Sequence, residues 1–146
     1  MAKTQAYSIK NVAAVLDGQK IIGFWDGDDV VVVEDLEDVG QMMIGADGSG
    51  IFSQSASNGA RITIRLQHGS ATHRLLLEKL AVQRTPGFKI TPFSFSCIDV
   101  DSQEGGVAAE CFIEKAPSDS KGKNATQREW QLVTANWARN IPPATN

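Results

Sequence analysis

The sequence has no Lys or Arg between Lys20 and Arg61, and this absence is the most uneven feature of its composition. The same interval holds eight of the 17 acidic residues: Asp26, Asp28, Asp29, Glu34, Asp35, Glu37, Asp38 and Asp47. It therefore carries −8, whereas the remainder, with 14 bases against nine acids, carries +5. This uneven charge disfavours nucleic-acid binding by the first third of the chain and favours self-association through faces of complementary charge.

Long hydrophobic runs are also missing. No apolar stretch approaches the roughly 18 to 20 residues needed to span a bilayer, and the start MAKTQAYSIKN has no hydrophobic segment to act as a signal peptide. We therefore expect no membrane association and a protein that is made in a cytosol.

The chain has only two cysteines, which are too few for a disulfide scaffold and lack metal-ligand spacing. Cys97 and Cys111 are symmetric about residue 104 in a predicted hairpin with SQEGG at its tip, so we expect them to be cross-strand neighbours. In a reducing cytosol, two thiols that face each other as small apolar groups are favoured over a disulfide.

Catalytic and cofactor motifs are absent: there is no nucleophile elbow, phosphate-cradling glycine loop or zinc pattern. His68 and His73 have no nearby nucleophile or third ligand, so we interpret them as solvated histidines at a helix start. The acids from Asp26 resemble the opening of a calcium loop, but Val31 stands at the sixth position, where the turn needs Gly. The sequence predicts no enzyme activity, no metal and no cofactor.

What the sequence does contain is a globular composition, with 42% hydrophobic and 21% charged residues in 146. The length fits one domain, and neither a repeat nor a linker divides it. We expect a single domain over residues 1–146, with flexible ends at about 1–6 and 140–146.

The first half predicts short strands. NVAAVLDGQKIIGF is typical of a hairpin that turns at Asp17-Gly18, and a strand is expected from Val30 to Glu34 after the loop WDGDD. A short apolar piece follows at Met42 to Ile44. The stretch GADGSGIFSQSASNGA is rich in Gly and Ser and predicts a long loop that contains one short strand.

The middle of the chain gives the clearest periodicities. ARITIRLQ alternates, with Ile62, Ile64 and Leu66 on one face, and predicts a half-buried strand. ATHRLLLEKLAVQR predicts an amphipathic helix at about 71–84, capped by Ser70 and ended by Pro86-Gly87. Its apolar face is expected to hold Leu76, Leu77, Leu80 and Ala81.

The last third predicts three more strands, in FKITPFSFSCIDV, in VAAECFIEKA and from about Arg128 to Ala138. Phe93, Phe95 and Cys97 share a face of the first. Many short strands and one helix indicate a mainly β (α+β) fold, an antiparallel β-sandwich or barrel with a flanking amphipathic helix.

Arg61 and Arg65 share a strand face with polar neighbours, where they could contact phosphate. Two such arginines more often form a solvated face or pair with carboxylates, so nucleic-acid binding is disfavoured. The spacing of Trp25, Trp130 and Trp137 does not suit a base-stacking platform and favours core or interface positions.

Three stretches, taken in order, resemble the tail tube proteins of contractile-tailed bacteriophages. They are IIGFWDGDDVVVVEDLEDVG, GADGSGIFSQSASNGARITIRL and ECFIEKAPSDSKGKNATQREWQLVTAN, and the likeness covers about Val12 to Asn136. It is carried by Gly23-Phe24, Asp26-Gly27-Asp28, Gly45-Ala46-Asp47-Gly48, Ser57-Asn58 and Arg128-Glu129-Trp130.

The resemblance implies a β-sandwich-like subunit with a flanking helix, assembled into hexameric rings that stack into a tube for genome delivery. The type VI secretion tube protein has a similar fold, and no member of the family is an enzyme. The implied partners are copies of the chain itself, the tail sheath, the baseplate, the tail terminator, the tape measure protein and transiting DNA, which is not bound specifically. The implied location is the phage tail of the virion, assembled in the bacterial host cytoplasm.

Two roles stay open for the acidic stretch, which would face the lumen and repel DNA, or meet a basic patch on the next ring. If the strand of Arg61 and Arg65 lines the lumen, we expect acids opposite them. The assembly or lumen candidates are Asp26, Asp28, Asp29, Glu34, Asp35, Glu37, Asp38, Arg61, Arg65, Arg128 and Glu129. The alternatives are another ring-forming tail component, a secretion-type tube protein, or a small β-domain that binds a ligand or nucleic acid.

Overall fold

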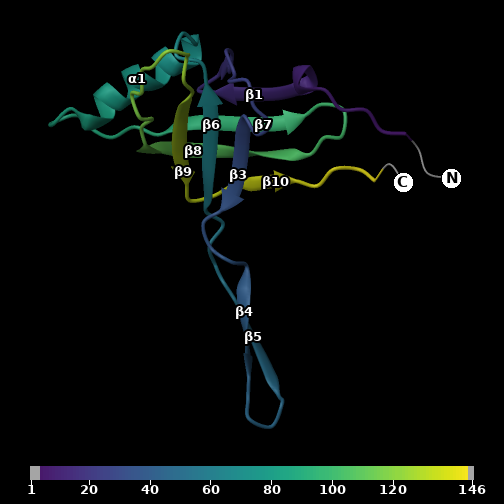
Figure 1. Cartoon of the computed structure of the whole chain (residues 1–146). Coiled ribbons are helices and arrows are strands. Elements are labelled where there is room, and N and C mark those ends of the chain that lie inside the picture. The colour runs from purple at the N-terminus through teal and green to yellow at the C-terminus, as the bar shows by residue number, and fades with distance from the viewer. Residues whose placement is uncertain (1–3, 145–146) are drawn as a thin grey trace.

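The computed structural model describes residues 4–144, and most of them are in or between antiparallel strands (Figure 1). In chain order the elements are η1 (Ile9–Asn11), β1 (Val12–Leu16), β2 (Gln19–Lys20), β3 (Val31–Asp35), β4 (Gly40–Ile44), β5 (Gly50–Gln54), β6 (Ala60–Leu66), α1 (Ala71–Arg84), β7 (Phe93–Asp99), β8 (Gly105–Lys115), β9 (Arg128–Thr134) and β10 (Ala138–Asn140). The expectation of a mainly β fold with one α-helix is confirmed.

One large sheet forms the body. Its strand order is β2-β1-β7-β8-β9-β6-β3, β10 adds to β8, and every pairing is antiparallel. The long strand β8 changes register between Ile113 and Lys115, and β6 and β3 run across the direction of β7 and β8 (Figure 1). The sheet therefore curves around its own core, which holds Leu16, Ile62, Ile64, Leu66, Leu76, Phe95, Cys111, Trp130 and Leu132 without solvent exposure.

The β1–β2 hairpin forms where the sequence predicts it. Both central residues of its turn have positive φ, 51° at Asp17 and 78° at Gly18, which is the geometry that the Asp-Gly dipeptide favours. Val15 pairs with Lys20 and Leu16 with Gln19 across the turn.

The alternating strand is also confirmed as β6. It lies between β3 and β9, and its Ile62, Ile64 and Leu66 side chains are fully buried. Arg61 and Arg65 point to the opposite face and are half-buried there.

Helix α1 has the predicted bounds, and Ser70 caps it, because the Ser70 Oγ accepts hydrogen bonds from the amides of Thr72 (3.1 Å) and His73 (3.3 Å). The predicted apolar face is wrong in part. Thr72, His73 and Leu76 are buried, whereas Leu77 and Ala81 are exposed. The polar contacts of the first turn, which include a bond from the Ile22 amide to Thr72 Oγ1, set the rotation of the helix.

Two strand bounds and one tail differ from expectation. The strand expected at residues 30–34 is Val31–Asp35, and the strand expected from Arg128 to Ala138 is divided into β9 and β10. The division falls where Asn136 bridges to Asn58, so that β10 leaves β9 and pairs with β8 instead. The predicted flexible C-terminal end begins within β10, at Asn140, and the outermost residues of both predicted ends, 1–3 and 145–146, lie outside the described residues.

The predicted pairing of the cysteines is wrong. Cys97 lies opposite Gly106 in the β7–β8 hairpin, and Cys111 lies opposite Phe93. The turn occupies residues 100–104 and is centred before residue 104, and a register shift between Phe93 and Phe95 displaces the far end of β8. Both cysteines are free, as expected.

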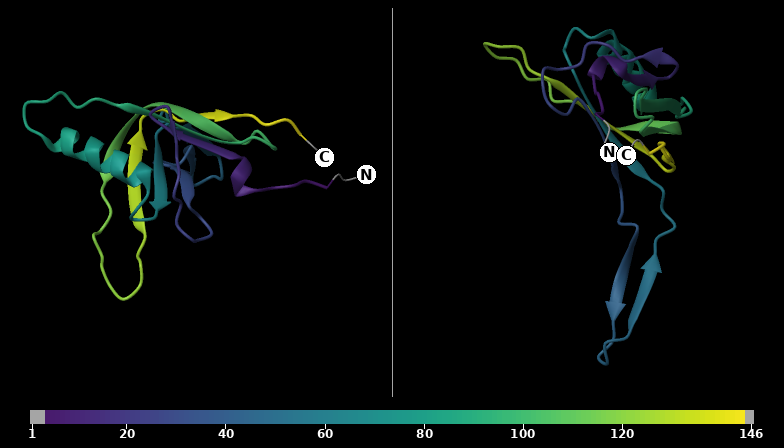
Figure 2. Two further views of the ribbon diagram at one scale, coloured as in Figure 1. Left: turned by 90° about the horizontal axis from the view of Figure 1, so that it is seen from above. Right: turned by 90° about the vertical axis from the view of Figure 1, so that its right-hand side faces the viewer.

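Residues 45–60, predicted as a long loop that contains one short strand, do contain one short strand, β5, but its pairing with β4 was not predicted. Residues 40–54 form a second hairpin, β4–β5, which we call the arm, and it stands away from the body (Figures 1 and 2). Glycine and serine are concentrated at its turn and at its root, where the composition is typical of a loop.

The described chain ends leave the body near each other (Figure 2). Residues 5–7 and 142–144 line one shallow hollow together with Asp99, Ser102 and Glu104 from the β7–β8 turn.

Candidate assembly surface

The acids of the first third lie on β3 and on the loops at its two ends. Asp26, Asp28 and Asp29 are exposed in the loop before β3, and Glu34 and Asp35 are exposed at its end. The valines between them are buried or half-buried: Val30 is 8% exposed, and Val31 and Val33 pack against the core. The valine run thus anchors a strand to the core while its carboxylates remain in solvent.

Strand β3 is an edge of the sheet. Among the described residues it pairs with β6 alone, from Val31 opposite Ile64 to Asp35 opposite Ala60. Its other side presents backbone donors and acceptors that a strand from another molecule can use.

The two arginines of β6 are neutralised within the chain. Arg61 Nε lies 2.6 Å from Glu114 Oε1 on β8, and its Nη1 lies 3.9 Å from Glu34, its cross-strand partner on β3. The bond and charge of Glu114 raise the pKa of Arg61. Arg65 Nε lies 3.1 Å from Glu129, its cross-strand partner on β9. Acids therefore stand opposite both arginines.

Arg65 also contacts the acidic loop before β3. Its Nη1 donates to the carbonyl oxygen of Asp29, which ties the acidic loop before β3 to the sheet. Asp35 at the other end of β3 pairs with Arg139 of β10 at 3.0 Å. These contacts hold the two ends of β3 in place, so Arg65 and Arg139 stabilise this face within the single chain.

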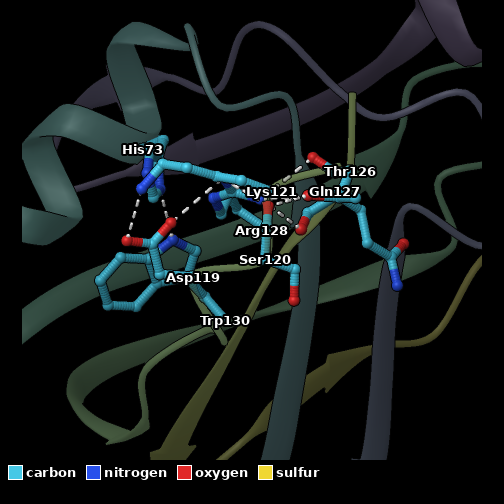
Figure 3. Close-up of polar contacts among 8 residues, drawn as sticks. All are labelled: His73, Asp119, Ser120, Lys121, Thr126, Gln127, Arg128 and Trp130. Carbon is cyan, nitrogen blue, oxygen red and sulfur yellow. Dashed lines mark hydrogen bonds and ion pairs between the residues drawn. The ribbon is translucent and has the colours of Figure 1, made fainter. Parts of the chain in front are cut away.

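Arg128 is buried, unlike the other candidate residues. Its guanidinium donates to the carbonyl oxygens of Ser120 (3.4 Å), Thr126 (3.2 Å) and Gln127 (3.1 Å), and lies 3.6 Å from Asp119 (Figure 3). It therefore fastens the loop between β8 and β9. Lys121 on that loop pairs with Asp119 at 3.0 Å and holds the pKa of this carboxyl below its usual value.

His73 is not the solvated histidine that the sequence indicated. It is 8% exposed, and its Nδ1 accepts a hydrogen bond from Trp130 Nε1 at 3.0 Å (Figure 3). Burial, followed by the charge of Arg128, lowers the pKa of His73, so the neutral ring is favoured. His68 is exposed, as expected. Trp130 is 57 residues away from His73 in the sequence, so no local pattern indicates this pair.

The arm carries the largest group of exposed apolar side chains. Met42, Met43, Ile44, Ile51 and Phe52 are 54–70% exposed. Met42 lies opposite Phe52 and Met43 opposite Ile51 in the hairpin, and because successive side chains of a strand point to opposite faces, both faces of the arm are apolar.

The tip and root of the arm are polar. At the tip, Asp47 accepts hydrogen bonds from the amide (3.1 Å) and the hydroxyl (2.6 Å) of Ser49, and these bonds lower its pKa. At the root, Glu37 accepts a bond from Ser55 at 3.3 Å, and Asp38 is exposed. The arm is thus an apolar band between two acidic ends, and it has no Lys or Arg.

The described residues contain no group of three or more His, Cys, Asp or Glu placed to hold a metal ion. Among residues 4–144, no helix has the length and apolar character that a membrane crossing requires.

Solved structures from contractile injection systems have a fold similar to that of this chain. The sheath and tube terminator of an extracellular contractile injection system, PVC, in its extended state is similar with a TM-score of 0.67 at 13% identity, over 96% of this chain and 100% of that chain. The tube-terminating cap of the anti-feeding prophage, AFP, gives 0.60 at 9% identity, over 96% and 94%. The PVC sheath–tube complex in its extended state gives 0.60 at 13% identity, over 92% and 91%.

Sequence comparison gives the family. No curated protein matches the chain, but the family model described as the bacteriophage PhiTE tail tube protein matches residues 4–140. The match spans nearly all of the 146 residues and agrees with the fold and with the resemblance of the sequence motifs. The chain therefore belongs to the bacteriophage PhiTE tail tube protein family and has a structural role of the tail tube type.

Proposed function

We propose that this protein is the subunit of a phage tail tube and that it acts by self-assembly into closed hexameric rings that stack into a channel for genome delivery. The observation that carries the proposal is the arm, a two-stranded hairpin whose apolar faces lie in solvent in the single chain. An isolated two-stranded hairpin is marginally stable in water, and an apolar surface of this kind is typical of a protein contact.

The edge strand β3 supports the same proposal. An open edge next to an apolar arm would promote uncontrolled aggregation in a protein that stays alone. A closed ring removes such edges by pairing them between neighbours, so one assembly covers the arm and the edge together.

The acids fit a tube through which DNA slides. Asp26, Asp28 and Asp29, together with those of β3 and the arm root, would repel phosphates if they face the lumen. Arg61 and Arg65 already pair with carboxylates, so the sheet face that bears them has little free positive charge to hold DNA. We propose that transiting DNA and the tape measure protein occupy the lumen without specific binding.

The other partners follow from the same role. We propose that the whole chain is one domain, that it contacts the tail sheath, the baseplate and the tail terminator, and that it assembles in the bacterial host cytoplasm before it becomes part of the virion tail. No catalytic activity belongs to this role.

A tube terminator is the second candidate, because the solved structures that resemble this fold include a terminator and a terminating cap. The two functions differ in whether stacking has a limit. A tube subunit adds ring upon ring, whereas a terminator ring ends the stack.

Negative-stain electron microscopy of the purified full chain, with the mass measured by light scattering, separates these functions. Long hollow tubes are the expected result. Single rings that never stack would favour the terminator. A monomer at every concentration, combined with tight and salt-sensitive DNA binding, would overturn both in favour of a small nucleic-acid-binding domain.

The role of the acids requires a separate experiment. Asp35 pairs with Arg139 and Glu37 bonds to Ser55 within the chain, whereas Asp38 has no ion pair among the described residues. Asp38→Lys is therefore the cleanest charge reversal. Shorter tubes or fewer tubes would support a contact between this acid and a basic patch of the next ring, and tubes of normal length would count against that contact.

A further inference from the structure

One end of the body carries an open hollow with apolar and acidic lining, which we call the acidic hollow. Its volume is about 530 Å³, and its apolar lining includes the buried or half-buried side chains of Val31, Val33 and Trp137. Asp28 and Glu104 are exposed at the same hollow. A volume of this order is large enough to receive several side chains of a partner.

The acidic hollow has an excess of negative charge. Its carboxylates come from Asp28, Asp29, Asp99 and Glu104. Arg139 also lines the hollow, but it already pairs with Asp35 at 3.0 Å. The Asp99 carboxylate accepts a hydrogen bond from the Ser102 hydroxyl at 3.0 Å, which holds the β7–β8 turn in place. The hollow is therefore complementary to a partner that combines apolar side chains with positive charge.

The loop after α1 has that combination. This basic loop, residues 85–92, contains no acidic residue and exposes Phe88 (66%) and Ile90 (53%). Lys89 lies between these two side chains, and Arg84 precedes the loop at the end of the helix. Both bases are exposed, and neither forms an ion pair within residues 4–144.

The two surfaces lie at opposite ends of the body (Figures 1 and 2). The basic loop follows α1 at the left of Figure 1, whereas the β7–β8 turn, which contributes to the acidic hollow, lies at the right. The loop of one chain therefore cannot reach its own hollow. A contact between the two surfaces joins different copies head to tail, and such a heterologous contact closes into a ring when the rotation between copies closes.

We propose that the basic loop of one copy docks in the acidic hollow of the next copy, with Phe88 against the apolar lining and Lys89 among the carboxylates. The proposal rests on the tail-tube function above and specifies which surfaces of two bodies meet. Asp28 and Asp29 would then face the basic loop of a neighbour rather than the lumen.

An exchange of charges tests the contact. Lys89→Glu and Glu104→Lys should each raise the critical concentration for assembly, measured by pelleting, by roughly 3- to 10-fold, because each variant brings like charges together. The double variant Lys89→Glu/Glu104→Lys restores one opposite pair, so its critical concentration should be lower than that of either single variant. Both side chains are exposed and have no ion pair in the described chain, so urea unfolding of the dilute protein should stay unchanged.

Lys20 provides the matched control, because it is an exposed base outside both surfaces. Lys20→Glu changes the net charge by the same amount as Lys89→Glu. The double variant Lys20→Glu/Glu104→Lys should therefore assemble no better than Glu104→Lys alone, since the added carboxylate is not at the contact.

The native cysteines allow the position of the loop to be checked. Cys97 lines the acidic hollow, whereas Cys111 is fully buried. In assembled Phe88→Cys chains, a short bismaleimide should join the introduced thiol to Cys97 of another copy, detected as a ladder on a denaturing gel and by peptide mapping. Phe88→Cys/Cys97→Ala should lose this ladder, and dilute unassembled protein should give none.

The outcomes separate the two proposals. Tubes that form from Lys89→Glu at an unchanged critical concentration, a charge exchange that brings no recovery, or assembled chains without the crosslink to Cys97 would each overturn the docking contact and leave the tube function standing. Failure of the unsubstituted chain to form any assembly would overturn the tube function and the docking contact together.

Discussion

Replacing Phe52 with Ser should weaken assembly without weakening the fold. Phe52 is 54% exposed in the single chain, so about half of its surface is available for burial by a partner. Full burial of such a side chain contributes about 1.5–3 kcal/mol, so the contact contributes roughly 0.8–1.6 kcal/mol. One arm is added with each copy, so the critical concentration for tube growth should rise by about 4- to 15-fold.

Pelleting of tubes over a concentration series measures that critical concentration, and urea unfolding of the dilute protein measures stability. The unfolding free energy should change by less than about 0.5 kcal/mol, because the Phe52 ring lies over Gly40 of the arm and is not part of the hydrophobic core. Val100→Ser is the matched control, since Val100 is 60% exposed and lies outside the arm. An unchanged critical concentration in Phe52→Ser, or an equal rise in Val100→Ser, would refute the reasoning.

Three further predictions concern the body. The pKa of His73 is lower in the folded state than in the unfolded state, so the unfolded chain binds the proton more tightly and the urea midpoint should fall as the pH drops below about 6.5. A midpoint that stays constant from pH 7.5 to 5 would contradict this prediction. The control variant His68→Gln should retain the pH dependence. Gly105→Ala should lower the unfolding free energy by about 2–4 kcal/mol, because the φ of Gly105 is 153° and a Cβ there would overlap the Cys97 carbonyl. Gly122 has open space around it, so Gly122→Ala should lower the unfolding free energy by almost nothing. Equal losses for the two variants in calorimetry would contradict this prediction. Burial raises the pKa of Cys111 to about 11, so maleimide at pH 7 should leave Cys111 unmodified in the native protein, and rapid modification detected by mass spectrometry would contradict its burial.

The sequence predicted those elements whose local pattern and tertiary environment agree. The alternation of Ile62, Ile64 and Leu66 specifies a strand with one buried face, and β6 lies inside the sheet between β9 and β3, with that face fully buried in the core. Ser70 and Pro86 mark the ends of α1 by backbone chemistry alone, and these limits need no knowledge of the rest of the chain.

Features that depend on distant parts of the chain were missed, as was the pairing of β4 with β5. The sequence signals of the arm are turn residues, and apolar alternation is weak there because both faces carry apolar side chains. His73 owes its burial to Trp130, which is 57 residues away, and the register of Cys111 depends on a bulge between Phe93 and Phe95. These long-range features have no local signature.

For the candidate site, Glu34 and Glu129 lie opposite Arg61 and Arg65 across the sheet. The expectation of acids opposite these arginines applied to a strand that lines the lumen, and the direction that the acids face stays a prediction. The internal role of Arg128 could not be predicted, because the carbonyl groups that it binds converge only when the β8–β9 loop is folded.

The closeness of the two described ends offers a route to engineering. Residues 5–7 and 142–144 line the same hollow, so a short Gly/Ser linker could join them and the chain could be reopened elsewhere. The exposed loop between β8 and β9 is a natural place for the new ends, provided that the contacts of Arg128 at its base are kept. A cargo protein fused to the new ends of such a circular permutant would be attached at a different region of each subunit. The position of a displayed protein on the assembly could therefore be chosen by the site of permutation.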